Sequence, residues 1–178
     1  MKSITLALAG MVALLFSGDA PRPQDSKPGP GPAAAKADVE SVEAIVKSLY
    51  DVISGAAGQE RNWDRFRSLF APKGKLTAVG QKRTLVMTPE DYVAQSGPYL
   101  VKNGFFEREI ARRADEFGDL AQVFSTYESK HKAEDEKAFA RGINSIQLIK
   151  EKDRWWVVSI AWCEENPNRP IPKEYLPK

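Results

Sequence analysis

The second half of the chain constrains the fold most, because it holds strand-like runs separated by polar turns. From residue 119 to 162 it reads DLAQVFSTYESKHKAEDEKAFARGINSIQLIKEKDRWWVVSIAW, in which three runs rich in Val, Ile, Tyr and Trp are joined by two charged turns. Runs of this kind are typical of antiparallel strands that pair with their sequence neighbours. We therefore expect four long strands, at 105–114, 120–129, 139–150 and 154–163.

The residues before these strands favour helices. Apolar side chains recur at helical spacing over 38–53, with Asp38 as the expected N-cap. A shorter helix is expected over 62–70, stopped by a proline. A third is expected over 88–103, because it opens on a Thr-Pro-Glu-Asp start signal, and Gly97-Pro98 should interrupt it.

Between the second and third helices, residues 75–79 and 83–87 predict a small hairpin around a glycine. Helices first and long strands afterwards are typical of an α+β fold with helices on one face of a sheet. We expect a cone: a curved antiparallel sheet closed by three N-terminal helices, with an internal cavity in its mouth.

The two ends of the chain differ from this domain in composition. Residues 1–20 have a positive start, a short apolar run and small residues after it, which predicts a secretory signal peptide. Residues 21–37 form a linker rich in Pro, Gly and Ala, and residues 165–178 form a Pro-rich tail. The predicted domain therefore spans 38–164, in a secreted or periplasmic protein without a stable membrane anchor after cleavage.

Composition excludes several chemistries. The chain has 26 Lys and Arg against 24 Asp and Glu, a net charge of +2, and its charges alternate in sign, so we expect no nucleic-acid partner. It has one cysteine, Cys163, and one histidine, His131, too few for a zinc site of Cys and His ligands. We expect no metal and no cofactor, Cys163 as a small buried side chain, and His131 as an exposed turn residue.

The chain resembles the nuclear transport factor 2-like superfamily, and within it the SnoaL-like group of small bacterial domains with a cystatin-like α+β fold. The resemblance covers about residues 38–164 and is carried by SLFAP at 68–72, VFSTYES at 123–129, RGINSIQL at 141–148 and RWWVVSIAW at 154–162. It implies a cone-shaped fold and leaves the activity open, because such folds host enzymes as well as binding domains.

Two enzymatic interpretations of this resemblance lack their residues. A ketosteroid-isomerase-like reaction implies a carboxylate base on the strand after the second helix, where residues 75–79 contain no acid, although Tyr50 is available as the tyrosine. A scytalone-dehydratase-like reaction implies histidines in the pocket, and His131 lies between lysines at a turn.

The leading hypothesis is a non-catalytic domain that binds a small, partly apolar ligand or a protein partner in its cone. A pocket needs apolar walls and a few polar groups that fix orientation. The candidate ligand-binding residues are Tyr50, Trp63, Phe66, Tyr92, Tyr99, Asn144, Gln147 and Trp162.

The alternative is a SnoaL-like isomerase, cyclase or hydrolase in which Glu107, Tyr127 and Arg141 converge in the pocket. Strict alternation places Glu107 and Glu109 on one face of their strand and Arg112 on the other.

The last strand is apolar on both faces, one with Trp155 and Val157, the other with Trp156, Val158, Ile160 and Trp162. One face must then be covered from outside, which favours a homodimer through the sheet face. A third hypothesis is an interaction module with a solid core, whose tail mediates contacts.

Overall fold

The computed structural model describes residues 33–178. The predicted signal peptide and residues 21–32 of the predicted linker lie outside the described residues. The elements in chain order are α1 (Lys36–Val39), α2 (Val42–Ile53), α3 (Trp63–Ser68), β1 (Phe70–Val79), β2 (Thr84–Met87), α4 (Pro89–Asn103), β3 (Phe106–Phe117), β4 (Leu120–Lys130), β5 (Ala140–Glu151), β6 (Arg154–Glu164) and the short 3-10 helix η1 (Lys173–Tyr175).

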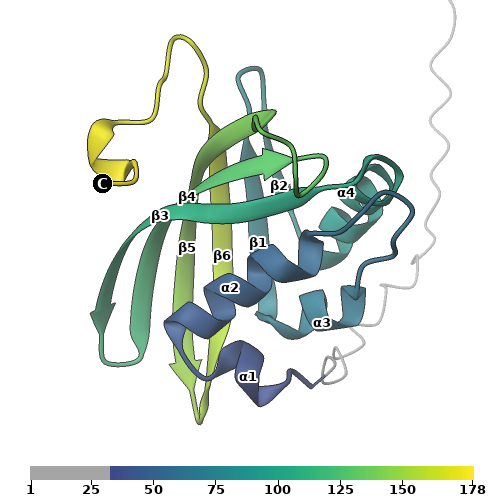
Figure 1. Cartoon of the computed structure of the whole chain (residues 1–178). Helices are drawn as coiled ribbons and strands as arrows, with labels where there is room; N and C mark the ends of the chain where they lie inside the picture. The colour runs from purple at the N-terminus through teal and green to yellow at the C-terminus, as the bar shows by residue number, and fades with distance from the viewer. Residues whose placement is uncertain (1–32) are drawn as a thin grey trace, which may run out of the picture.

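The strands form one curved, unclosed sheet in the order β2-β1-β6-β5-β4-β3, and α1 to α4 lie on its concave side (Figure 1). The predicted α+β class and the four long antiparallel strands, β3 to β6, are confirmed. The predicted hairpin of β1 and β2 is also present. Within residues 33–178, β1 and β6 form the single parallel pair, which was not predicted and which joins the hairpin to the larger sheet.

Two bulges interrupt the alternation of side chains in the antiparallel part of the sheet, and a further irregularity lies between Phe70 and Lys75 where β1 pairs with β6. Ile110 is an extra residue in β3 opposite β4, and Val158 is an extra residue in β6 opposite β5. A bulge places two successive side chains on the same face and increases the local twist. In both strands the added residue lies on the convex face, which lengthens that face and bends the sheet around the helices.

The predicted first helix is two helices. Ser41 has extended backbone angles and accepts a hydrogen bond from the N–H of Ala44 at 3.0 Å, so α2 starts there with its own cap. Asp38 is not an N-cap. Its carboxylate accepts two hydrogen bonds from Arg65 of α3, both at 2.8 Å, and one from Ser48 of α2 at 3.0 Å. This contact fixes the first three helices to one another.

The predicted interruption of α4 is wrong, and its predicted start is confirmed. Thr88 and Asp91 form a capping box, and the helix continues through Pro98 to Asn103. A side chain at Gly97 would lie 3.2 Å from the ring of Trp63, so this glycine lets α4 pack against α3. Likewise, Pro72 does not stop the second helix, which ends at Ser68, and lies within β1.

Arg61 holds the loop between α2 and α3. Its guanidinium donates only to backbone carbonyls: those of Ile53 at 2.9 Å, Gly55 at 2.7 Å and Leu100 at 3.1 Å, besides Ala56 and Gln59. The side chain is 6% exposed, and its burial lowers the pKa of the guanidinium. The loop and the end of α4 are therefore fixed to one cation through their main chains.

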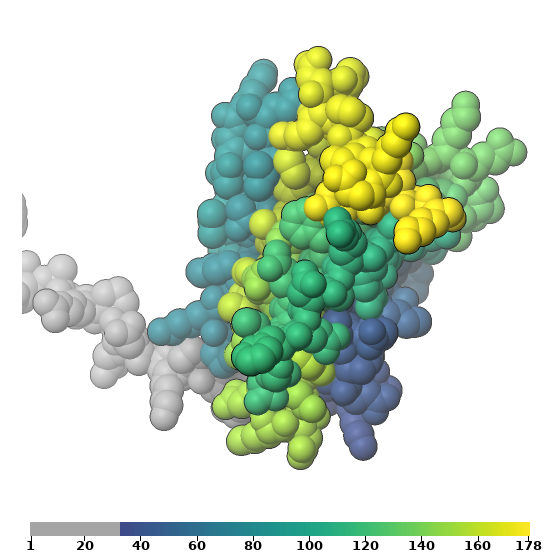
Figure 2. All heavy atoms as spheres, turned by 90° about the vertical axis from the view of Figure 1, so that its left-hand side faces the viewer, coloured from purple at the N-terminus to yellow at the C-terminus, as the bar shows by residue number. Residues whose placement is uncertain are grey.

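The C-terminal tail folds back over the convex face of the sheet. Thr126 of β4 donates a hydrogen bond to the carbonyl of Tyr175 at 2.7 Å, and the Tyr175 ring packs on Phe124 and beneath the guanidinium of Arg113. Figure 2 shows the tail in bright yellow against the surface of β3. The tail thus covers part of the face through which the sequence predicts a homodimer. No helix among the described residues is long and apolar enough to cross a membrane.

Candidate functional site

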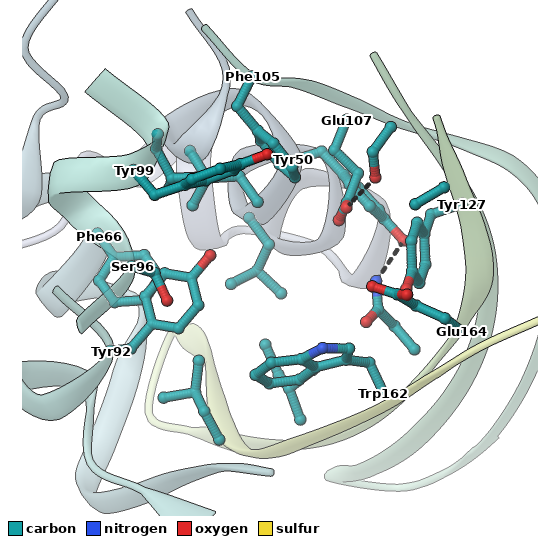
Figure 3. A pocket seen from close by; sticks show the side chains of 18 of the residues that line it. Tyr50, Phe66, Tyr92, Ser96, Tyr99, Phe105, Glu107, Tyr127, Trp162 and Glu164 are labelled. Atoms are coloured by element: carbon teal, nitrogen blue, oxygen red, sulfur yellow. Dashed lines mark hydrogen bonds between the residues drawn. The ribbon is translucent and has the colours of Figure 1, made fainter. Parts of the chain in front are cut away.

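A cavity of about 500 Å³ lies between the helices and the concave face of the sheet. It is walled by α2, α3 and α4 on one side and by β1 and β3 to β6 on the other (Figure 3). The lining residues with exposed side chains mark its mouth: Gln95, Tyr99, Phe139 and Glu164. This cavity lies where the sequence predicts one, beside a packed hydrophobic core.

The apolar part of the cavity is built from aromatic contacts between helices and sheet. The Phe66 ring of α3 stacks on the Tyr92 ring of α4, with centroids 5.2 Å apart, and Tyr92 meets the edge of Trp162 of β6 at 6.2 Å. Rings packed in this way are worth about 0.5–1.5 kcal/mol beyond their buried area. They join α3, α4 and β6 around the apolar part of the cavity.

The polar part is a directed chain of hydrogen bonds. Asn144 donates to the hydroxyl of Tyr50 at 3.0 Å, which lies 2.6 Å from the hydroxyl of Ser125. Ser125 donates to the carboxylate of Glu109, and Arg112 forms an ion pair with the same carboxylate at 2.8 Å. Because Ser125 has one proton and gives it to Glu109, Tyr50 must donate to Ser125 and accept from Asn144.

Glu107 of β3 lies inside the cavity near this chain. Its carboxylate accepts a hydrogen bond from Ser129 at 2.7 Å. Burial raises the pKa of Glu107 to about 7, with a further increase from the charge of Glu164, while hydrogen bonds from Ser129 and Asn144 oppose the shift. Glu107 therefore changes its charge in the neutral pH range.

Tyr127 is placed by a glycine in the neighbouring strand. Gly142 faces Tyr127 across β4 and β5, and a Cβ at Gly142 would lie 2.6 Å from the Tyr127 hydroxyl. The ring thus lies over the missing side chain, with its hydroxyl on the same side of the cavity as Glu164 and Glu107 (Figure 3). Burial raises the pKa values of Tyr50, Tyr92 and Tyr127, so all three stay neutral at ordinary pH.

The structure brings most of the predicted ligand-binding residues together. Six line the cavity: Tyr50, Phe66, Tyr92, Tyr99, Asn144 and Trp162. Two do not. Trp63 packs between Phe66 and Gly97 outside the lining, and Gln147 pairs with Gln122 across the strands on the convex face.

The predicted catalytic set does not converge. Glu107 and Tyr127 line the cavity, but Arg141 lies opposite Glu128 on the convex face and forms an ion pair with Glu165 at 2.9 Å. Arg112 shows the reverse error. It was expected on the face opposite Glu109, and the bulge at Ile110 turns it to the concave face, beside Glu109. The bulge at Val158 likewise puts Trp155 and Val157 on the same face as Ile160 and Trp162.

The one histidine and the one cysteine of the chain lie outside the cavity lining. The His131 ring stacks on Phe139 with centroids 4.2 Å apart and lies 3.2 Å from the carbonyl of Gly104, so it is part of the packing rather than fully exposed. Cys163 is half-buried, and its thiol donates to the carbonyl of Val79 at 3.4 Å. Among residues 33–178, no group of three or more His, Cys, Asp or Glu side chains is arranged to hold a metal ion.

Sequence reasoning missed several residues of the site, among them Phe105, Glu164, Ser125 and Ser129. Phe105 immediately precedes β3, and Glu164 is the last residue of β6. Ser125 and Ser129 alternate with Tyr127 in β4. The alternation in VFSTYES was a usable signal for the two serines, because they share the face of Tyr127. Nothing local distinguishes Glu164 from the other charged residues near turns.

No protein-family model matches the chain, and no curated protein matches it. Solved structures do. A protein of unknown function with a cystatin-like fold from Nostoc punctiforme matches with a TM-score of 0.55 and 12% identity, over 74% of this chain and 92% of that one. A protein of unknown function from Pseudomonas putida, described as NTF2-like, matches with a TM-score of 0.55 and 10% identity, over 72% and 89%.

The structure of LinA, a third match, has a TM-score of 0.53 and 14% identity, over 70% of this chain and 86% of that one. At such identities the shared property is the fold. The curved six-stranded sheet, the helices on its concave side and these matches give one conclusion: this chain has the nuclear transport factor 2-like fold, as its sequence resemblance implied.

Proposed function

We propose that this protein binds a small, partly apolar molecule in the cavity of its curved sheet, and that it does so after export from the cytoplasm. The observation that carries the proposal is the cavity itself, about 500 Å³ in volume and lined by aromatic and aliphatic side chains with a few polar groups at one side. Binding sites for small molecules have this size and composition.

Two hydroxyl groups are available to orient such a ligand. The hydroxyls of Tyr92 and Tyr127 face the cavity, and neither is hydrogen-bonded to another side chain drawn there (Figure 3). A ligand that offers each hydroxyl a hydrogen-bond partner is held in one orientation. The composition of residues 1–20 supports export, and the N-terminal sequence of the mature protein tests it.

The enzymatic alternative requires Arg141 in the cavity, but Arg141 lies on the other face of the sheet. Tyr50 is also committed to its neighbours, since it donates its proton to Ser125 rather than into the cavity. A binding function needs neither group to be free, so the geometry supports binding better than catalysis.

Titration with N-phenyl-1-naphthylamine, a neutral apolar fluorescent probe, tests the proposal. We expect one probe per chain and enhanced fluorescence, because the probe leaves water for an aromatic cavity. Ser96→Trp, which fills the cavity from α4, should abolish binding. Ala94→Trp adds the same ring on an exposed position of α4 and should leave binding unchanged. Absence of saturable binding, or equal binding by Ser96→Trp, would contradict the proposal.

A further inference from the structure

The charge of the cavity lining has one sign. Glu107 lies inside the cavity and Glu164 at its mouth, and among the described residues no Lys, Arg or His side chain lines it. Arg112, the arginine in the polar chain, already forms an ion pair with Glu109 at 2.8 Å. A ligand in this space therefore meets negative charge without a compensating protein cation.

Two of the hydroxyls near Glu107 have already donated their protons. Ser129 gives its only proton to Glu107, and Tyr50 gives its only proton to Ser125. What these groups have left for a ligand is lone pairs, because a hydroxyl that has donated its proton can only accept. The region beside Glu107 thus favours a ligand group that donates hydrogen bonds.

Aromatic rings surround this region. Eight of the lining residues are aromatic, among them Tyr92, Tyr99, Phe105 and Trp162. The faces of such rings attract cations, by about 0.5–1 kcal/mol at exposed sites and about 2 kcal/mol where water is excluded. Acidic groups, acceptors and ring faces all select the same kind of ligand.

We propose that the ligand of this cavity is a protonated amine on an apolar body, with its ammonium group beside Glu107 and its body among the aromatic rings. This inference rests on the proposed binding function and adds the chemical class of the ligand. An ammonium donates up to three hydrogen bonds, and Glu107 and its acceptor neighbours provide the matching sites.

The charge state of Glu107 makes binding depend on pH. Glu107 faces Ser129 and Tyr127 from β4, Asn144 from β5 and Glu164 from β6, and the helices add two neutral tyrosines, Tyr50 from α2 and Tyr92 from α4. Because its pKa is raised to about 7, the carboxylate is mostly protonated at pH 5.5 and mostly charged at pH 8. Affinity for an ammonium should therefore rise across this interval by at least about tenfold, while affinity for a neutral ligand stays constant.

Three probes that share an apolar phenylalkyl part and differ in their polar group test the inference: 4-phenylbutylamine, 4-phenylbutan-1-ol and 4-phenylbutyrate. Their affinities are measured by calorimetry at pH 8. We expect the amine to bind at least about tenfold more tightly than the alcohol, and the carboxylate more weakly than both. Glu107→Gln should abolish the preference for the amine, because the amide carries no charge and still accepts from Ser129. Glu116→Gln removes the same charge from an exposed position on β3 and should keep the preference.

The outcomes separate this inference from the function on which it rests. Alcohol binding as tight as amine binding, or a preference that survives in Glu107→Gln, overturns the ammonium site and leaves the binding function intact. If neither the three probes nor the naphthylamine binds, the binding function fails and the ammonium site fails with it. Binding of the alcohol by Glu107→Gln shows that this variant is folded.

Discussion

Glu107 carries a cost in stability that its position in the cavity explains. Burial raises its pKa from about 4.5 to about 7, so between these pH values the folded protein binds more protons than the unfolded chain. The free energy of unfolding must then fall as pH rises through this interval and level off above it. A carboxylate kept at such a cost is typical of a functional site rather than of a packing residue.

We expect Glu107→Gln to be more stable than the wild type at pH 8, by about 2–3 kcal/mol, and equally stable at pH 4.5. The amide avoids the cost of a buried charge and keeps the hydrogen bond from Ser129. Urea unfolding at the two pH values measures the difference, and Glu116→Gln should show none. A variant less stable than the wild type at pH 8 would mean that the buried charge is not penalised.

The bulge in β6 decides which side chains of that strand reach the core. Val157 is fully buried, Val158 and Ser159 both turn to the convex face, and Ile160 returns to the core. Without the extra residue, Val158 and Ile160 would share a face. The bulge therefore allows both Trp155 and Trp162 to face the helices, one in the core and one in the cavity.

Alanine substitutions test this assignment. Ile160→Ala should lower the free energy of unfolding by about 2–5 kcal/mol, because it removes a buried apolar side chain and enlarges the cavity that Ile160 lines. Val158→Ala should cost less than about 1 kcal/mol, since its side chain is 36% exposed. Similar costs for the two variants in chemical denaturation would contradict the register described here.

Signals in the local sequence predicted the elements well. The start of α4 at Thr88 and the strand-rich second half depend on near neighbours, and the sequence shows them directly. The bulges at Ile110 and Val158 depend on pairing across the sheet, so alternation alone put Arg112 on the wrong face. The cavity residues on helices were predictable for the same local reason, whereas Gln147 and Arg141 required the register of β5.

The assembled molecule presents a convex sheet face that its own tail covers in part. Tyr175 occupies the surface of β3 and β4, and within residues 33–178 Ile149 of β5 and Val158 of β6 remain exposed beside it. We propose that two copies pair through this open surface, as the apolar character of β6 suggests. The tail then limits the interface to the strands it does not cover.

Removing residues 170–178 should strengthen that pairing, because it uncovers Phe124 and Thr126 beside the proposed interface. We expect the dimer dissociation constant to fall by about tenfold. Sedimentation equilibrium over a range of concentrations measures it, and Tyr175→Ala, which removes the ring but keeps the tail, should give a smaller change in the same direction. If full-length and shortened chains are both monomeric at high concentration, the sheet-face dimer is wrong.

The hydrogen bonds from Arg61 to main-chain oxygens decide which residues of this loop can change in evolution. Because this cation recognises peptide groups and not side chains, Ala56, Ala57 and Glu60 can change identity while the path of the loop persists. Two glycines are exceptions: a methyl group at Gly55 would collide with the guanidinium at 2.6 Å, and Gly58 has a φ of +78°, which side chains disfavour. In a library randomised over 55–61, survivors should keep Gly55, Gly58 and Arg61 and vary most at the other positions.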